Sequence, residues 1–90
     1  MLRMTQTKLG RTTTVFAEGK ILGAWVPEVR SAIDAIPDGH ARKLDLGGVT
    51  FVDAEGAELI SMLRRDGIEI VSCSHFLADL LDRYNHSPPR

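Results

Sequence analysis

Three acidic residues crowd into one short stretch of the sequence and form its first candidate site. Asp53, Glu55 and Glu58 follow the segment Gly47–Val52. Carboxylate oxygens are ligands for hard cations, and two carboxylates can divide acid and base roles when burial raises the pKa of one. Acidic side chains are equally favoured at helix N-termini, where they meet the positive end of the helix dipole. A helix is predicted to start near Asp53, so we interpret these acids as helix-start residues and predict no metal site.

The same stretch is also a candidate for a phosphate or nucleotide site. In sheets of alternating strands and helices, ligands collect in the loops at the carboxyl ends of the strands. The glycines here, Gly47, Gly48 and Gly56, match neither the dinucleotide-binding spacing nor the P-loop spacing. The neighbouring carboxylates would repel an anion. We therefore predict that no nucleotide binds here, and the sequence indicates no cofactor of another kind.

A cysteine and a histidine lie at the predicted start of the last helix. The helix dipole could lower the pKa of Cys73, and His75 could take its proton. A catalytic nucleophile also needs an orienting third group and an oxyanion site, and the sequence shows neither. We favour a small residue that closes a strand, while a thiol enzyme or redox sensor built on Cys73 stays open. The histidines and the cysteine show no metal-ligand spacing.

The single tryptophan is the last residue singled out by type. Trp25 follows Gly23-Ala24 and directly precedes a predicted helix. One interpretation is a packing residue that fixes the angle at which the chain enters the helix. The other is a partly exposed aromatic anchor for a protein partner, since tryptophan is a frequent hot-spot residue.

Length and charge restrict the class of protein. Ninety residues are one small domain, and the 11 Lys and Arg against 12 Asp and Glu give a net charge of -1. Without an excess of basic residues, the composition does not indicate a nucleic-acid-binding protein. It contains no apolar stretch of the roughly 20 residues that a membrane span needs, so we expect no membrane insertion and a cytoplasmic location. The one Cys excludes an internal disulfide.

The elements that must position these residues follow from the apolar spacing. A β-branched run at Thr12–Phe16 predicts a strand, joined through Gly10-Arg11 to a weaker one at Thr5–Leu9. The steps of three and four between Val26, Val29, Ile33 and Ile36 predict a helix. Further strands are predicted at Arg42–Leu46 and Ile68–Val71, with Gly47-Gly48 loosening the chain. Two more helices are predicted, one from about Asp53 to Asp66 and one capped by Ser74, whose inward residues are Leu77, Leu80, Leu81 and Tyr84.

This order predicts an α/β fold. Strands that alternate with helices favour a mixed, mostly parallel sheet, here of four or five strands flanked by three or more helices. The first strand is expected to run antiparallel at an edge. We predict a single domain over residues 1–90, with its core at about 9–84 and flexible ends at 1–4 and 86–90, where Pro88-Pro89 stops any helix.

The sequence resembles the STAS domain, the family of sulfate transporters and anti-sigma-factor antagonists. The family pattern is G-R-L-D, then P-E-L, then V-L-D-L-S-G-V-T-F-I-D-S-S-G-L. Its counterparts here are Gly19-Lys20-Ile21, Pro27-Glu28-Val29, Leu44-Asp45-Leu46, Gly48-Val49-Thr50-Phe51-Val52-Asp53, Gly56 and Leu59. The resemblance covers about residues 9–81, and its specific part is Leu44–Gly56. It implies a mixed sheet flanked by helices, in agreement with the element order.

The chain departs from the family pattern at the residues that carry its switch. In stand-alone members that resemble anti-sigma-factor antagonists, a partner kinase phosphorylates the second Ser of the D-S-S-G turn and so breaks the complex. Here that turn reads Asp53-Ala54-Glu55-Gly56, with Glu55 at the phosphoacceptor position. The acidic residue of G-R-L-D is replaced by Leu22. Glu55 carries one negative charge where phosphoserine carries about -1.5 to -2, so it either imitates the phosphorylated form, suits a different partner, or serves only the helix start.

The resemblance implies a non-catalytic protein–protein interaction module. The turn residues Asp53, Ala54, Glu55, Gly56 and Glu58 and the loop residues Leu22, Gly23 and Trp25 would face the partner. The leading hypothesis is a bacterial regulator that binds an anti-sigma-factor or kinase-like protein outside Ser phosphocontrol. The alternative is an accessory subunit that docks on a membrane transporter ATPase.

Overall fold

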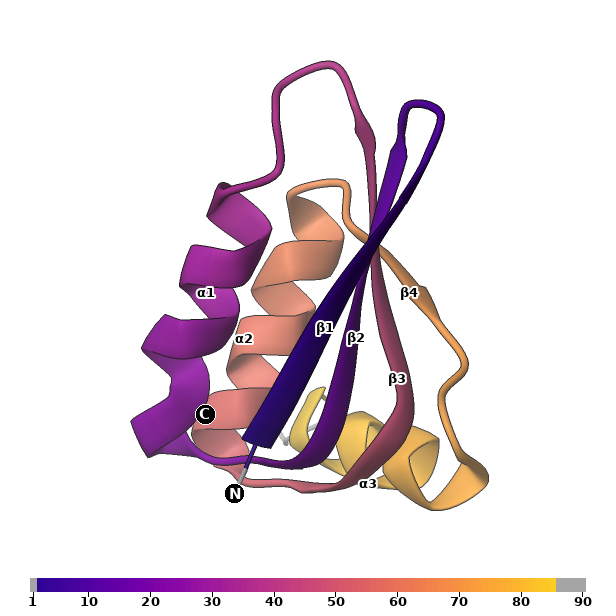
Figure 1. Cartoon of the computed structure of the whole chain (residues 1–90). Coiled ribbons are helices and arrows are strands. Elements are labelled where there is room, and N and C mark those ends of the chain that lie inside the picture. Colours follow the sequence, from indigo (N-terminus) through magenta and orange to yellow (C-terminus); the bar gives the residue numbers. More distant parts are fainter. Residues whose placement is uncertain (1, 86–90) are drawn as a thin grey trace.

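The computed structural model describes residues 2–85, which form one four-stranded sheet with helices packed on it. The strands are β1 (Leu2–Leu9), β2 (Thr12–Ile21), β3 (Ala41–Val52) and β4 (Glu69–Val71). The helices are α1 (Val26–Asp34), α2 (Ala54–Arg65) and α3 (His75–Asn85), with a short 3-10 turn, η1 (Gly23–Trp25), before α1. The strand order β1-β2-β3-β4 is the chain order (Figure 1). The predicted α/β fold with a mixed sheet is therefore confirmed.

The first two strands form the predicted antiparallel hairpin at an edge of the sheet. Leu9 pairs with Thr12, which leaves Gly10 and Arg11 as a two-residue turn. Gly10 has a φ of 60°, the left-handed conformation that favours glycine at this turn position. The strand β1 is longer than predicted. Its residues Leu2 to Met4, which we expected in a flexible end, pair with Ala17 to Gly19 of β2. Leu2 and Met4 also pack against the core, which explains why this segment is ordered. The other expected flexible end, residues 86–90, lies outside the described residues.

The third strand is also longer than the sequence indicates. We predicted it over Arg42–Leu46 with a loop from Gly47, but β3 continues to Val52. Its parallel pairing with β2 shifts register between Phe16 and Glu18 and again between Gly19 and Lys20. The glycine pair lies at the first irregularity, and a side chain at Gly48 would meet the side chains of Glu18 and Phe16. The glycines thus admit a close approach inside the strand rather than ending it.

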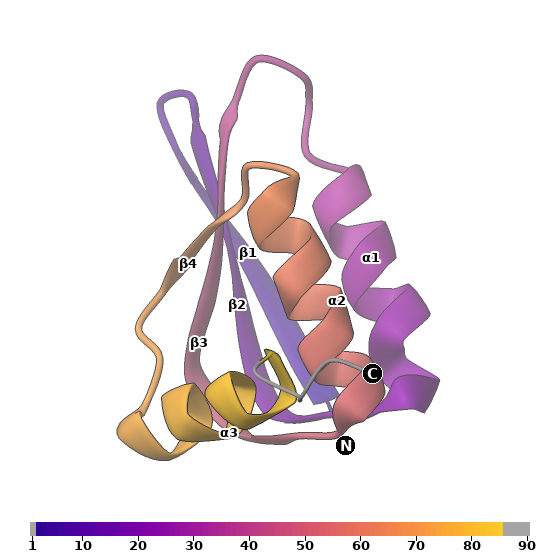
Figure 2. The same cartoon turned by 180° about the vertical axis from the view of Figure 1, so that it is seen from behind.

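The helices α1 and α2 lie side by side on one face of the sheet, and α3 packs across one end against α2 and β3 (Figures 1 and 2). On β2, alternate side chains enter the core beneath these helices: Val15 and Ala17 are buried while Phe16 stays partly exposed.

The predicted inward residues of α3 do pack inward, with Leu77 and Leu81 buried. Ser74 caps α3 as predicted, since its Oγ accepts a hydrogen bond from the Leu77 N–H at 3.1 Å. The core is made of apolar residues from every layer: Val15, Ala17, Ile21, Val29, Ile33, Ile36, Leu44, Leu46, Val49, Val52, Ala57, Leu59, Ile60, Leu63, Ile68, Leu77 and Leu81.

Candidate functional site

The acidic stretch lies where β3 passes into α2. Val52 ends the strand, Ala54 begins the helix, and Asp53 is the N-cap between them with an extended backbone. Its Oδ1 accepts a hydrogen bond from the Gly56 N–H at 2.8 Å. A carboxylate at this position satisfies a backbone donor that the helix leaves free and complements the helix dipole. The start of the helix predicted near Asp53 is thereby confirmed, and its cause is the cap.

The other oxygen of the same carboxylate reaches a second loop. Asp53 Oδ2 accepts a hydrogen bond from the Gly23 N–H at 2.8 Å. The backbone supports this link, because the Asp53 N–H lies 3.3 Å from the Ile21 carbonyl oxygen and the Trp25 N–H donates to the Leu22 carbonyl at 2.8 Å. The Asp53 side chain therefore joins η1 to the start of α2, and its backbone N–H joins this junction to the end of β2. The two segments that the sequence analysis assigned to one surface do lie together.

Gly56 is the position at which this junction is packed most tightly. It is buried, and a methyl group built on it would overlap the carbonyl oxygen of Ile21. The absence of a side chain lets the first turn of α2 lie directly on the end of β2. In the sequence, only the resemblance to the family pattern indicates a glycine in this turn. The physical requirement for glycine becomes visible only when Ile21 is seen against it.

Glu55 lies over the second loop. A methyl group built on Gly23 would overlap the Glu55 carboxylate, so the glycine leaves room for this side chain. Ala54, Glu55 and Glu58 are exposed at the start of α2, while Leu22 and Trp25 are partly buried. The turn thus presents two carboxylates to solvent, while Asp53 is turned inward to the two backbone N–H groups.

A shallow groove of about 280 Å³ runs from this turn along the two parallel helices. One wall comes from α1 and the other from α2, and Glu55 and Glu58 stand at its rim. Its lining residues are Val26, Pro27, Arg30, Glu55, Glu58, Leu59 and Met62. Nothing in the sequence analysis indicated this groove, although the spacing of Glu55, Leu59 and Met62 on one helix face could have done so.

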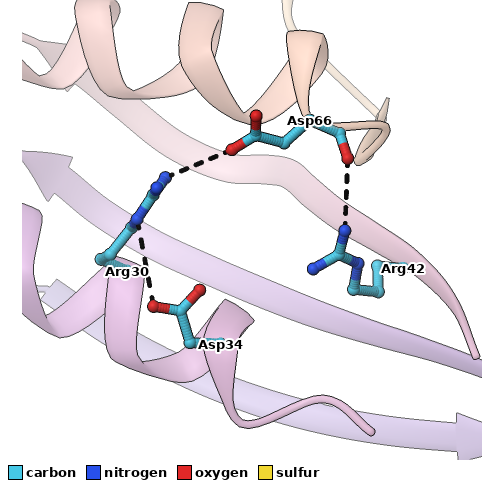
Figure 3. A network of polar contacts seen from close by, with 4 residues as sticks. All are labelled: Arg30, Asp34, Arg42 and Asp66. Carbon is cyan, nitrogen blue, oxygen red and sulfur yellow. Dashed lines mark hydrogen bonds and ion pairs between the residues drawn. The ribbon is translucent and has the colours of Figure 1, made fainter. Parts of the chain in front are cut away.

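A small polar network includes Arg30, one of the residues that line the groove (Figure 3). Arg30 Nε lies 4.0 Å from Asp34 Oδ2, and Arg30 Nη1 lies 3.7 Å from Asp66 Oδ2. Arg42 Nη2 donates to the Asp66 carbonyl oxygen at 3.2 Å. The network ties α1 and the start of β3 to the end of α2. Only the i, i+4 spacing of Arg30 and Asp34 signals it in the sequence.

The environment of Cys73 does not favour a reactive thiolate. Burial raises the pKa of the Cys73 thiol above its usual value, an effect that the nearby Arg64 only partly offsets. His75 is exposed at the first position of α3. A nucleophilic cysteine needs a lowered pKa, so the direction of the shift opposes the thiol hypothesis. Among residues 2–85, no three side chains of the His, Cys, Asp and Glu types are grouped so that they could hold a metal ion.

No protein-family model matches the chain, and no curated protein is significantly similar to it. Solved structures do match. The anti-sigma factor antagonist SpoIIAA in its unphosphorylated form aligns with a TM-score of 0.67 and 18% identity, over 90% of this chain and 83% of that one. This chain has the SpoIIAA fold. A second structure, Mglu, aligns with a TM-score of 0.64 and 23% identity, over 79% of this chain and 20% of its own. The STAS-like architecture expected from the sequence is confirmed.

No helix in the described part of the chain combines the length and the apolar character that crossing a membrane requires.

Proposed function

We propose that this chain is a non-catalytic protein–protein interaction module that acts in regulatory signalling as anti-sigma-factor antagonists do. Its contact surface would be the turn Asp53–Glu58 together with the loop Leu22–Trp25. The observation that carries the proposal is the Asp53 carboxylate, which holds the Gly23 and Gly56 N–H groups at 2.8 Å each. This clamp fixes the two segments as one surface. The SpoIIAA fold supports the proposal, because that protein is an anti-sigma factor antagonist.

The proposed module differs from a phosphorylation switch in one respect. Neither Ala54 nor Glu55 has a hydroxyl group, and Glu55 places a permanent carboxylate at the turn. The nearby hydroxyl groups lie outside the turn. Thr50 is in β3, where its Oγ1 donates to the Gly19 carbonyl oxygen at 3.3 Å. Ser61 is half-buried on α2. Binding to the partner would therefore be constant rather than switched by phosphate at this turn.

The test begins with the partner. Cross-linking in the native cells, followed by mass spectrometry, should identify an anti-sigma-factor or kinase-like protein. A transporter ATPase instead would overturn the regulatory role. Incubation of the purified pair with ATP should add no phosphate to this chain by intact-mass measurement. Phosphate mapped to Thr50 or Ser61 would show that the switch has moved to another residue.

The contribution of the turn is tested by Glu55→Ser, with melting temperature and partner affinity measured together. Glu55 stabilises the helix start by roughly 0.3–1 kcal/mol, and serine is acceptable there, so the fold should survive. We expect a fall in affinity of tenfold or more, which corresponds to about 1.4 kcal/mol or more. Unchanged affinity would remove Glu55 from the interface. Increased affinity would mean that Glu55 imitates the phosphorylated state.

A further inference from the structure

The groove between α1 and α2 has an apolar floor that nothing in the described chain covers. Val26 and Pro27 contribute from α1, and Leu59 and Met62 contribute from α2. Met62 is 39% exposed, which makes it one of the exposed large apolar side chains among the described residues. At about 280 Å³ the groove is smaller than the roughly 300–1,000 Å³ of most small-molecule sites. Its size suits one or two protein side chains better than a cofactor.

The charge of the groove is unbalanced. Its one cation, Arg30, forms ion pairs with Asp34 and Asp66 at 4.0 and 3.7 Å, and its buried Nη1 makes no hydrogen bond within the described residues. The ion pairs within residues 2–85 include neither Glu55 nor Glu58, and both side chains are exposed. An occupant that complements this groove therefore carries an apolar side chain beside positive charge.

The chain itself presents such a feature at the tip of its β1–β2 hairpin. Leu9 is 85% exposed, and the exposed cations Lys8 and Arg11 flank it along the sequence, with Lys8 projecting from the opposite face of β1. A methyl group at Gly10 would meet no atom within 4 Å, so the turn stands free of the rest of the molecule. The tip thus combines an exposed apolar side chain with two positive charges, and this combination complements the acidic, apolar groove.

The two features lie at opposite ends of the molecule. The hairpin tip extends past the C-terminal ends of α1 and α2 (Figures 1 and 2). The groove is lined from the N-terminal ends of these helices, by Val26 and Pro27 of α1 and by Glu55 and Glu58 of α2. The molecule is elongated, with extents of 42 × 27 × 24 Å. One copy therefore cannot fill its own groove, and the contact must be made between copies.

We propose that the hairpin tip Lys8–Arg11 of one copy of this chain docks into the α1–α2 groove of the next. Leu9 enters the groove beside Met62, and the positive charge of the tip is attracted to Glu55 and Glu58. The contact is head-to-tail, so it builds open chains of copies or closes into a ring. Because only a four-residue tip enters the groove, we expect a contact smaller than a standard interface of about 1,600 Å² and a weak, transient association. It covers Glu55 and so competes with the partner of the proposed function.

The experiment is sedimentation velocity of the full chain from 10 µM to 1 mM. The weight-average mass should rise above the monomer value of 9.9 kDa with concentration. It should fall back as NaCl is raised from 50 to 500 mM, because salt screens exposed charge pairs. Leu9→Ser should weaken association at least tenfold. The matched control is Phe76→Ser, which removes a side chain of 61% exposure outside the tip and the groove and should change nothing.

Charge exchange tests the geometry. A Glu55→Lys/Glu58→Lys variant and a Lys8→Glu/Arg11→Glu variant should each stay monomeric alone, with circular dichroism showing that both are folded. When the two variants are mixed they should associate. The acidic tip of the second variant then meets the basic groove of the first, and the basic tip of the first meets the acidic groove of the second. A wild-type chain that stays monomeric at 1 mM, an association untouched by Leu9→Ser, or a mixture that stays monomeric would each overturn the proposal. The proposed function is judged separately, from the partner affinity of the wild-type chain and of Glu55→Ser measured at chain concentrations below those that cause self-association.

Discussion

At the scale of single residues, Asp53 has more to do than an ordinary helix cap. Its two carboxylate oxygens serve two different segments, since one accepts from Gly56 in α2 and the other from Gly23 in η1. Removing it would leave two backbone donors without acceptors in a partly buried place. The arrangement of the whole candidate surface rests on this one side chain.

We expect Asp53→Ala to lower the free energy of unfolding by about 2 kcal/mol, more than the roughly 1 kcal/mol typical of a lost cap alone. Asp53→Asn should fall between, because its single carbonyl oxygen can replace one acceptor while its amide cannot accept from the other N–H. Urea unfolding of the three proteins measures this. Equal stability of the Asn variant and the wild type would contradict the two-donor role.

The second prediction at this scale concerns Cys73. Burial raises the pKa of its thiol in the folded chain, so the folded state favours the protonated form. A group of this kind contributes stability that is present below its unfolded pKa and is lost as the pH rises through the folded value. We expect stability to fall from about pH 9 upward by more in the wild type than in Cys73→Ala. Urea unfolding at pH 7 and pH 10 gives the comparison, and equal losses in both proteins would contradict it.

At the scale of elements, the junction between β2 and α2 sets the path of the chain. Alanine is normally about 1 kcal/mol better than glycine inside a helix. At Gly56 alanine should instead be less stable than glycine, because its methyl group would overlap the Ile21 carbonyl oxygen. We expect Gly56→Ala to destabilise the fold by about 1–3 kcal/mol. Ser61→Ala on the same helix is the control and should be neutral or slightly stabilising.

A strained residue lies between β4 and α3. Ser72 has a φ of 56°, in the left-handed region that costs a residue with a side chain about 1–2 kcal/mol. Glycine removes that cost but adds freedom to the unfolded chain. We expect Ser72→Gly to raise the free energy of unfolding by about 0.5–1 kcal/mol, whereas Ser31→Gly in α1 should lower it. Thermal unfolding of both variants checks the opposite signs.

Periodicity predicted the elements well where one face is buried. The steps between Val26, Val29 and Ile33 correspond to α1. Ile36, predicted on the same helix face, is buried but lies beyond the end of α1 at Asp34. The antiparallel edge strand follows from its hairpin turn. The length of β3 could not be predicted, because Gly47 and Gly48 weaken a strand on their own and are accommodated only beside Glu18 and Phe16. The bridge from Asp53 to Gly23 spans 30 residues, and no local pattern reports so distant a contact. The exposure of Leu9 could not be predicted from the sequence either, because it depends on how far the hairpin projects from the rest of the molecule.

At the scale of the whole molecule, the surface around the turn is acidic. Glu55 and Glu58 are exposed beside a helix start whose cap position is already filled by Asp53. A nucleotide phosphate would meet repulsion there, and the Gly56 N–H at the helix start already donates to Asp53. We expect titration of ATP or GTP into the chain to give no measurable heat by calorimetry. A dissociation constant in the micromolar range would contradict this prediction.

The strand order β1-β2-β3-β4, identical to the chain order, bears on how the protein is made. Each new strand adds to the edge left by the strand before it, so no segment has to wait for a distant later one before it can pair. Domains begin to fold from the N-terminus during synthesis, and the hairpin of β1 and β2 needs only local contacts. We therefore expect the sheet to assemble strand by strand as the chain leaves the ribosome. The β3 edge stays open to wrong partners until β4 has emerged.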